Sequence, residues 1–123
     1  MMWFDAHLDL AYLAVNGRNM HAPLHPPPPG GVGGPDLPAA VTPPSLSDGN
    51  VALALATIFT EPDGKGPEGY PAGDAERAWK VGRAQLEVYL TWRDQRHITL
   101  DLRPLLTRDV GTGEIRGGMG VSE

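Results

Sequence analysis

The sequence contains no cysteine, and its acidic residues outnumber its basic ones. Without cysteine the chain can form neither disulfides nor thiolate metal sites, so any metal ion must be held by histidine and carboxylate groups. The formal net charge is −5, with 10 Lys and Arg residues scattered among 15 Asp and Glu residues. This balance argues against nucleic acid as a partner, because proteins that bind nucleic acid concentrate positive charge on one face.

Signals for membrane insertion or secretion are also lacking. No apolar run approaches the roughly 18–20 residues that a bilayer-spanning helix needs. The first ten residues, MMWFDAHLDL, have no basic start and contain two acids where a secretory signal is apolar. The sequence therefore predicts a cytoplasmic protein that does not associate with membranes.

What the sequence does contain is the composition of one soluble globular domain, with 123 residues, 41% apolar and 20% charged. Alternation predicts a strand over residues 2–10, and Asn16-Gly17 is a turn signal after it. The stretch VALALATIF, residues 51–59, is apolar on both faces apart from Thr57. This pattern predicts a parallel strand that is covered on both sides.

Two loops are predicted from proline and glycine. Residues 22–49 hold nine of the 13 prolines, with the run Pro26–Pro29 directly followed by glycines. Proline removes a backbone donor and glycine raises the entropy cost of ordering, so we expect a long surface loop without helix or strand. The proline run itself is expected in the polyproline II conformation. A second loop is expected over residues 61–73.

A long amphipathic helix is predicted from Asp74, a plausible N-cap, to about Asp94. Its polar side carries Glu76, Arg77, Lys80, Arg83, Glu87, Thr91 and Asp94, and its apolar side carries Ala78, Trp79, Val81, Gly82, Leu86, Val88, Tyr89, Leu90 and Trp92. We expect the three aromatic residues to pack against a sheet, and we expect Glu76–Lys80 and Arg83–Glu87 ion pairs. Residues 97–102 are expected as a strand or as the extended entry to a short helix at 103–108.

The order of strand, loop, buried strand, loop and long helix is typical of the opening of an α/β fold with parallel strands. Within the first strand, His7 and Asp9 are two residues apart and therefore project to the same side. An imidazole nitrogen and a carboxylate oxygen are ligands that suit Zn²⁺. Asp5 is either a group that orients the imidazole or an acid at the strand edge. A solvent-facing strand with His7 bonded to Asp9 is the alternative.

The motif Asp5-Ala6-His7-Leu8-Asp9-Leu10 resembles D-[GA]-H-x-D-L, the opening motif of the membrane (renal) dipeptidase family. Gly49-Asn50-Val51 is similar to the G-x-V that opens that family's second strand. The long helix and the following LDLRPLLTR stretch come in a similar order. The resemblance implies a zinc-dependent peptidase with the TIM (β/α)8 barrel of the metal-dependent amidohydrolases.

For this chain the resemblance implies that His7 and Asp9 bind one zinc ion of a binuclear site that hydrolyses dipeptides or small amides. The family's bridging Glu and its two further His ligands have no counterpart here, and Glu123 is not assigned that role. A complete barrel needs about 250 residues, so we expect residues 1–123 to be the N-terminal portion of one. We assign no catalytic acid or base, and we expect little or no activity from these residues alone.

Three further expectations accompany this interpretation. His21, His25 and His97 are expected to be surface residues without a ligand role. Uncovered strand edges favour self-association, so a homo-oligomer is one possible state of the protein. Two other functions also stay open: a different amidohydrolase-type metal hydrolase, and a non-catalytic module whose proline run binds an aromatic groove.

Overall fold

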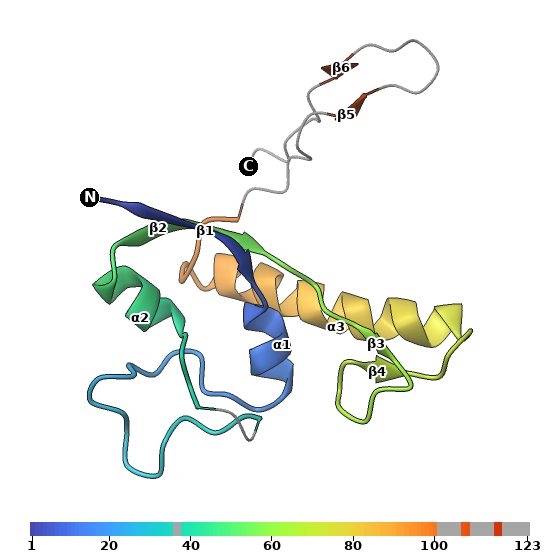
Figure 1. Ribbon diagram of the computed structural model, residues 1–123, viewed down its shortest axis with the longest axis horizontal. Coiled ribbons are helices and arrows are strands. Elements are labelled where there is room, and N and C mark those ends of the chain that lie inside the picture. The colour runs from blue at the N-terminus through green and yellow to red at the C-terminus, as the bar shows by residue number, and fades with distance from the viewer. Residues whose placement is uncertain (36–37, 101–106, 109–114, 117–123) are drawn as a thin grey trace. The chain divides into compact units, whose positions relative to one another are not determined.

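The structure is a computed structural model that describes residues 1–35, 38–100, 107–108 and 115–116 (Figure 1). It divides into two compact units, residues 1–89 and residues 90–123. The elements of the first unit, in chain order, are β1 (Trp3–Leu8), α1 (Leu10–Val15), α2 (Pro43–Asp48), β2 (Val51–Ala56), β3 (Glu61–Pro62), β4 (Gly69–Tyr70) and α3 (Ala75–Asp94), whose last residues belong to the second unit. The two main strands and the long helix therefore lie near their predicted places, but both strands end earlier than predicted, at Leu8 instead of residue 10 and at Ala56 instead of residue 59.

The strands β1 and β2 form a parallel pair, as the sequence predicts, and they lie side by side in Figure 1. Trp3 is opposite Val51, and Leu8 is opposite Ala56. The backbone N–H of Thr57 continues the pairing by donating to the Leu8 carbonyl at 3.2 Å. Because the strands are parallel, their carboxyl ends share one edge. The predicted eight-stranded barrel goes beyond this pair and stays a prediction.

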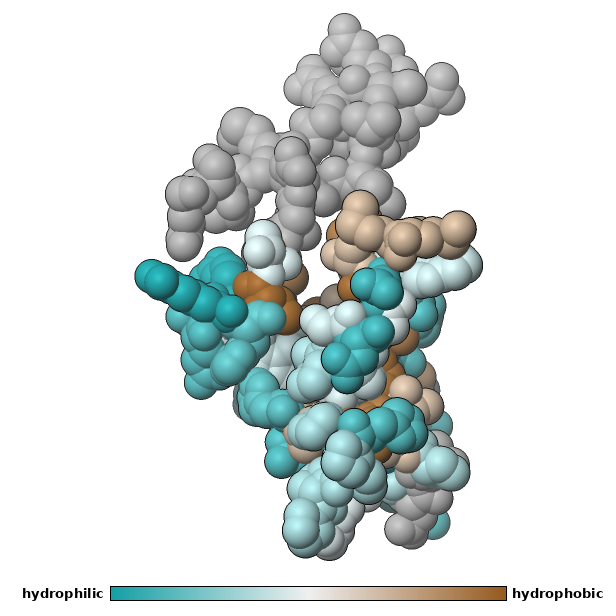
Figure 2. Space-filling view, turned by 90° about the vertical axis from the view of Figure 1, so that its left-hand side faces the viewer, coloured by the Kyte–Doolittle hydropathy of each residue, from teal (hydrophilic) through white to brown (hydrophobic). Residues whose placement is uncertain are grey.

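The expectation that residues 51–59 are buried on both faces is wrong for the described part of the chain. Leu53 is 62% exposed and Leu55 is 43% exposed, while Trp3 and Phe4 of β1 are 59% and 56% exposed. The physical reason is that the buried polar contact of α3 is made with Phe59, in the segment that follows β2, and not with the strand itself. Figure 2 accordingly shows apolar side chains, coloured brown, reaching the surface between polar groups.

Helix α3 begins as the sequence predicts. The Asp74 carboxylate accepts a hydrogen bond of 2.9 Å from the Arg77 backbone N–H, which is the N-cap geometry. All seven residues of the predicted polar side are exposed. The two predicted ion pairs are formed, Lys80–Glu76 at 2.7 Å and Arg83–Glu87 at 2.6 Å.

The aromatic residues of α3 divide into two groups. Tyr89 and Trp92 are buried, as expected, whereas Trp79 is 65% exposed, so its predicted packing against a sheet is wrong. Trp79 lies one turn from the start of the helix, opposite Ile58 of the segment that follows β2, and Ile58 is itself 48% exposed. A single partly exposed side chain covers too little of the indole to bury it.

Helix α3 is attached to the segment after β2 through a buried amide. The Gln85 side chain accepts a hydrogen bond of 2.9 Å from the Phe59 N–H, and its Nε2 donates to the Phe59 carbonyl. Gln85 is fully buried, and both of its polar atoms are thereby satisfied. The Phe59 ring also meets the Tyr12 ring of α1 edge to face, with 5.4 Å between centroids.

The proline-rich segment 22–49 is more ordered than predicted, because it ends in α2. Pro43 and Pro44 occupy the first positions of that helix, where a missing N–H costs no hydrogen bond. Thr42 caps it in a reciprocal box with Ser45. The fully buried Thr42 hydroxyl also donates to the Ala22 carbonyl at 2.9 Å.

The rest of the segment 22–49 also packs. Ala22, Leu24 and Val32 form a small buried cluster. The Arg18 guanidinium donates to the Gly33 carbonyl at 3.2 Å. The proline run turns at its end, where the Gly31 N–H donates to the Pro28 carbonyl at 2.9 Å. The proline run therefore ends in a turn. Its predicted role as a ligand for an aromatic groove stays a prediction.

Several small elements were not predicted. Helix α1 follows β1 directly, and β3 and β4 form a two-residue parallel pair inside the expected loop 61–73. In the second unit, β5 (Thr107–Arg108) and β6 (Ile115–Arg116) form an antiparallel pair. Residues 98–100 are in neither helix nor strand. The helix expected at 103–108 is wrong for residues 107–108, which form β5 instead, and its other residues lie outside the described part of the chain.

Candidate metal half-site

The candidate site lies at the carboxyl edge of the parallel pair. Asp9 follows β1 and occupies the N-cap position of α1, without a side-chain capping bond. Thr57 follows β2 directly. Ligands of open parallel sheets bind outside the carboxyl ends of the strands, so this edge is where a site is expected from topology alone.

His7 and Asp9 meet at this edge, as the sequence predicts. The His7 Nε2 atom lies 3.2 Å from the Asp9 Oδ1 atom. The side chain of His7 is 70% exposed and that of Asp9 is 35% exposed, so both are accessible from solvent. Two ligands of one tetrahedral zinc ion, each about 2.0–2.2 Å from the metal, lie about 3.3 Å apart. The spacing is compatible with one zinc ion, and it is equally the spacing of the solvent-facing His7–Asp9 pair that the sequence left open as the alternative.

Asp5 contacts the backbone instead of the imidazole ring. Its Oδ1 atom accepts a hydrogen bond of 2.9 Å from the His7 N–H. The acid thus supports the chain conformation at His7, where the β1–β2 register is irregular between Asp5 and Leu8. Its predicted role in orienting the imidazole stays a prediction.

Thr57 is a residue of the site that the sequence interpretation missed. Its hydroxyl lies within hydrogen-bonding distance of two acceptors, the Asp9 Oδ1 atom and the Leu8 carbonyl, the latter at 3.3 Å. A signal was present in the sequence, because Thr57 is the one polar residue in the apolar stretch 51–59. Its polar neighbour Asp9 is 48 residues away in the chain, which no local pattern reveals.

Tyr89 of α3 is the second residue that was missed. Its hydroxyl donates to the Thr57 carbonyl at 2.9 Å and accepts from the Ala11 N–H at 3.1 Å. Burial raises the pKa of Tyr89 above its usual value, and the nearby negative charge of Asp9 raises it further. Tyr89 therefore links the start of α1 to the end of β2 as a neutral phenol.

The described residues offer one pair of candidate ligands and no complete metal cage. His21, His25 and His97 are exposed, as predicted. Among residues with described placement, no group of three or more His, Asp or Glu side chains is arranged to hold a metal ion. Glu123 lies outside the described residues. Within the described residues, His7 and Asp9 are therefore a pair of candidate ligands and no more.

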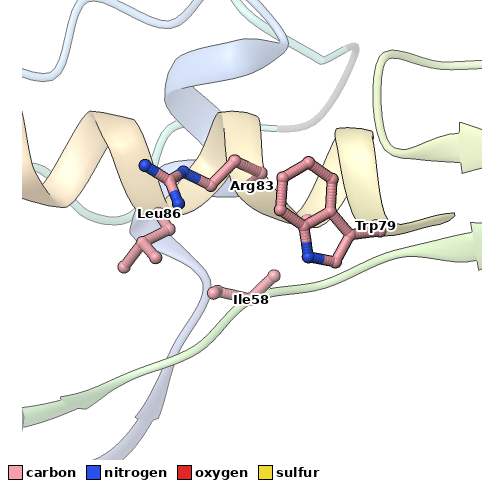
Figure 3. Close-up of a pocket in the computed structure, with 5 residues that line it drawn as sticks. Ile58, Trp79, Arg83 and Leu86 are labelled. Carbon is pink, nitrogen blue, oxygen red and sulfur yellow. The ribbon is translucent and has the colours of Figure 1, made fainter. Parts of the chain in front are cut away.

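An open apolar groove of about 290 Å³ lies between α3 and the segment after β2. It is lined by Ile58, Trp79, Gly82, Arg83 and Leu86. Figure 3 shows Trp79 and Leu86 on α3 on either side of Ile58. The Arg83 guanidinium pairs with Glu87, so the groove offers mainly apolar contact.

Comparisons with protein-family models, with curated proteins and with solved structures find no match. The resemblance to the dipeptidase family accordingly depends on the motif at residues 5–10 and the shorter one at 49–51. Among the helices of the described ranges, none has both the length and the apolar character needed to cross a membrane.

Proposed function

We propose that this chain supplies the first metal half-site of a zinc-dependent hydrolase of the dipeptidase kind. One observation carries the proposal: the His7 Nε2 and Asp9 Oδ1 atoms converge to 3.2 Å at the carboxyl edge of two parallel strands. The motif at residues 5–10 supports the choice of family, and the substrate class, a dipeptide or small amide, follows from that resemblance.

In this proposal His7 and Asp9 act as ligands and not as acid or base. A bound zinc ion supplies Lewis-acid activation of water for attack on an amide carbon. The chain's own groups hold the ion in place, because the imidazole gives a neutral donor and the carboxylate gives a negative one. The remaining ligands must come from other residues, since two donors hold zinc weakly.

The experiment is a Zn²⁺ titration followed by the imidazole ¹⁵N signals of each histidine. We expect the His7 signals to shift with a saturable dependence on the Zn²⁺ concentration. Asp9→Asn should weaken this binding about tenfold or more, because it removes the charged ligand while keeping its shape. The titration reports each histidine separately, so weak binding at His21, His25 or His97 does not obscure the result.

Asp48→Asn is the matched control, because Asp48 is an exposed acid at the end of α2. This variant should bind Zn²⁺ at His7 as the wild type does. An ordinary His7–Asp9 ion pair is the competing explanation of the 3.2 Å distance. If the His7 signals do not respond to Zn²⁺, or respond equally in Asp9→Asn, the ion pair is the correct explanation and the proposal is wrong.

A further inference from the structure

Thr57 lies next to the carboxylate of Asp9. Its hydroxyl contacts Asp9 Oδ1, and its backbone N–H donates to the Leu8 carbonyl at 3.2 Å. The same hydroxyl lies 3.3 Å from that carbonyl. Thr57 therefore touches both the backbone and the side chain at the end of β1.

Thr57 is itself held in place from the other side. Its carbonyl accepts the Tyr89 O–H at 2.9 Å, and Tyr89 is only 3% exposed. Two residues further on, the backbone N–H and carbonyl of Phe59 both form hydrogen bonds with the buried Gln85 side chain. The hydroxyl of Thr57 thus projects from a backbone that is fixed at both sides.

Asp9, in contrast, has a side chain that is 35% exposed and that makes no capping bond to α1. A carboxylate in such a position can adopt several rotamers, and ordering it on metal binding costs entropy. A hydroxyl that donates to the carboxylate restricts these rotamers before the metal arrives. Groups that orient metal ligands in this way typically change metal affinity by about 10–100-fold when they are removed.

We propose that Thr57 is the positioning residue of the half-site: its hydroxyl holds the Asp9 carboxylate in the orientation that meets His7. This inference rests on the proposed function, because it assigns a partner to one of the two ligands. It adds a role for β2, so that the two parallel strands contribute together to one site. Tyr89 contributes indirectly by holding the backbone of Thr57.

The test compares Zn²⁺ affinity at the His7 ¹⁵N signals in two variants. Thr57→Val removes the hydroxyl and keeps the shape of the side chain, and it should lower the affinity about tenfold. Thr57→Ser restores the hydroxyl and should retain affinity within about twofold of the wild type. The unfolding midpoint of each variant without metal is measured in parallel, to show that the variants are folded.

A double-variant cycle with Asp9→Asn separates positioning from a general structural effect. If Thr57 acts through the carboxylate, Thr57→Val has no further effect on Zn²⁺ affinity once Asp9 is replaced by Asn. An equal loss in both backgrounds, or wild-type affinity in Thr57→Val, would overturn the positioning role. In both cases a saturable Zn²⁺ response of the His7 signals that Asp9→Asn weakens would still support the half-site itself, so the two proposals fail separately.

Discussion

Among single residues, Tyr89 joins three elements close to His7 and Asp9. Its hydroxyl bonds to Ala11 at the start of α1 and to Thr57 at the end of β2, while its own backbone belongs to α3. A buried N–H and a partly buried carbonyl therefore depend on one phenol. Removing this hydroxyl should therefore change both the free energy of unfolding and the way that it depends on pH.

Replacing Tyr89 by Phe should lower the free energy of unfolding by about 1–3 kcal/mol, because the Ala11 N–H and the Thr57 carbonyl lose their shared partner. The wild type should also lose stability in alkali. The pKa of Tyr89 is raised in the folded state, so the unfolded chain releases this proton first. The contribution of the phenol is therefore full below pH about 10 and is lost as the pH rises from there through the raised folded pKa.

Urea unfolding at a series of pH values between 7 and 11 measures both effects. Tyr12→Phe is the matched control, because it removes a tyrosine hydroxyl from α1 and keeps the ring that meets Phe59. This control should keep the alkaline loss of stability, and Tyr89→Phe should reduce it. The interpretation fails if Tyr89→Phe shows the same alkaline loss as the wild type.

The predictability of the site residues follows from their separation along the chain. The pairing of His7 with Asp9 could be predicted from the sequence because the two residues are close along the chain, although Asp9 lies beyond the end of β1 and not in the strand whose alternation suggested the pairing. The contacts of Thr57 with Asp9 and of Tyr89 with Thr57 span 48 and 32 residues. Such contacts depend on how strands and helices are placed in space, which a local pattern does not encode.

Among the elements, α3 is the one that its own sequence explains best. It has an N-cap and a polar face that is exposed along its length. It also has two ion pairs, each of which joins oppositely charged residues four positions apart. Each of these features acts within one or two turns of helix. Local chemistry is therefore sufficient to fix where the helix begins and that its polar side faces solvent, whereas the exposure of Trp79 on the other side depends on tertiary contacts.

Asp74→Ala should lower the free energy of unfolding by about 1 kcal/mol, because the Arg77 N–H loses its acceptor in the first turn. Chemical unfolding followed by far-ultraviolet circular dichroism at 222 nm measures this change. Asp74→Ser is the control, since serine keeps an oxygen at the cap, and it should stay within about 0.5 kcal/mol of the wild type. Equal stability of Asp74→Ala and wild type would show that the cap contributes nothing.

The elements that the sequence did not reveal are short. Helices α1 and α2 have six residues each, and β3 and β4 have two each. Helices of this length are not stable by propensity and depend on tertiary contacts. For α2 the decisive contact joins Thr42 to Ala22, twenty residues apart, inside a segment whose composition suggested no regular structure.

At the scale of the first unit, residues 1–89, the main feature is an apolar surface that the unit itself leaves exposed. Leu53 on β2 and Trp79 on α3 are both more than 60% exposed. Parallel strands are ordinarily covered on both faces. The α/β order and the parallel pairing followed from the sequence, whereas the extent of coverage did not, because an apolar run does not state which other residues cover it.

This exposure predicts self-association that depends on concentration. Trp79→Gln should weaken it about tenfold, which corresponds to about 1.4 kcal/mol, because the variant removes a large exposed aromatic group and keeps a good helix former. Sedimentation velocity over a range of protein concentrations measures the change. Lys80→Gln, at the neighbouring exposed position of α3, is the control and should associate as the wild type does. Identical association of Trp79→Gln and wild type would remove Trp79 from the contact.

The bond between Thr42 and Ala22 has a consequence for how the chain can vary. The bond joins the two ends of the loop of residues 22–42. The distance between these ends therefore does not depend on how many residues the loop contains. The entropy of closing a loop grows only with the logarithm of its length, by about 0.6 kcal/mol for each doubling. The exposed stretch around Pro26, Pro27 and Gly30 is therefore where insertions, whether from evolution or an engineered affinity tag, would leave the spacing of β1 and β2 unchanged.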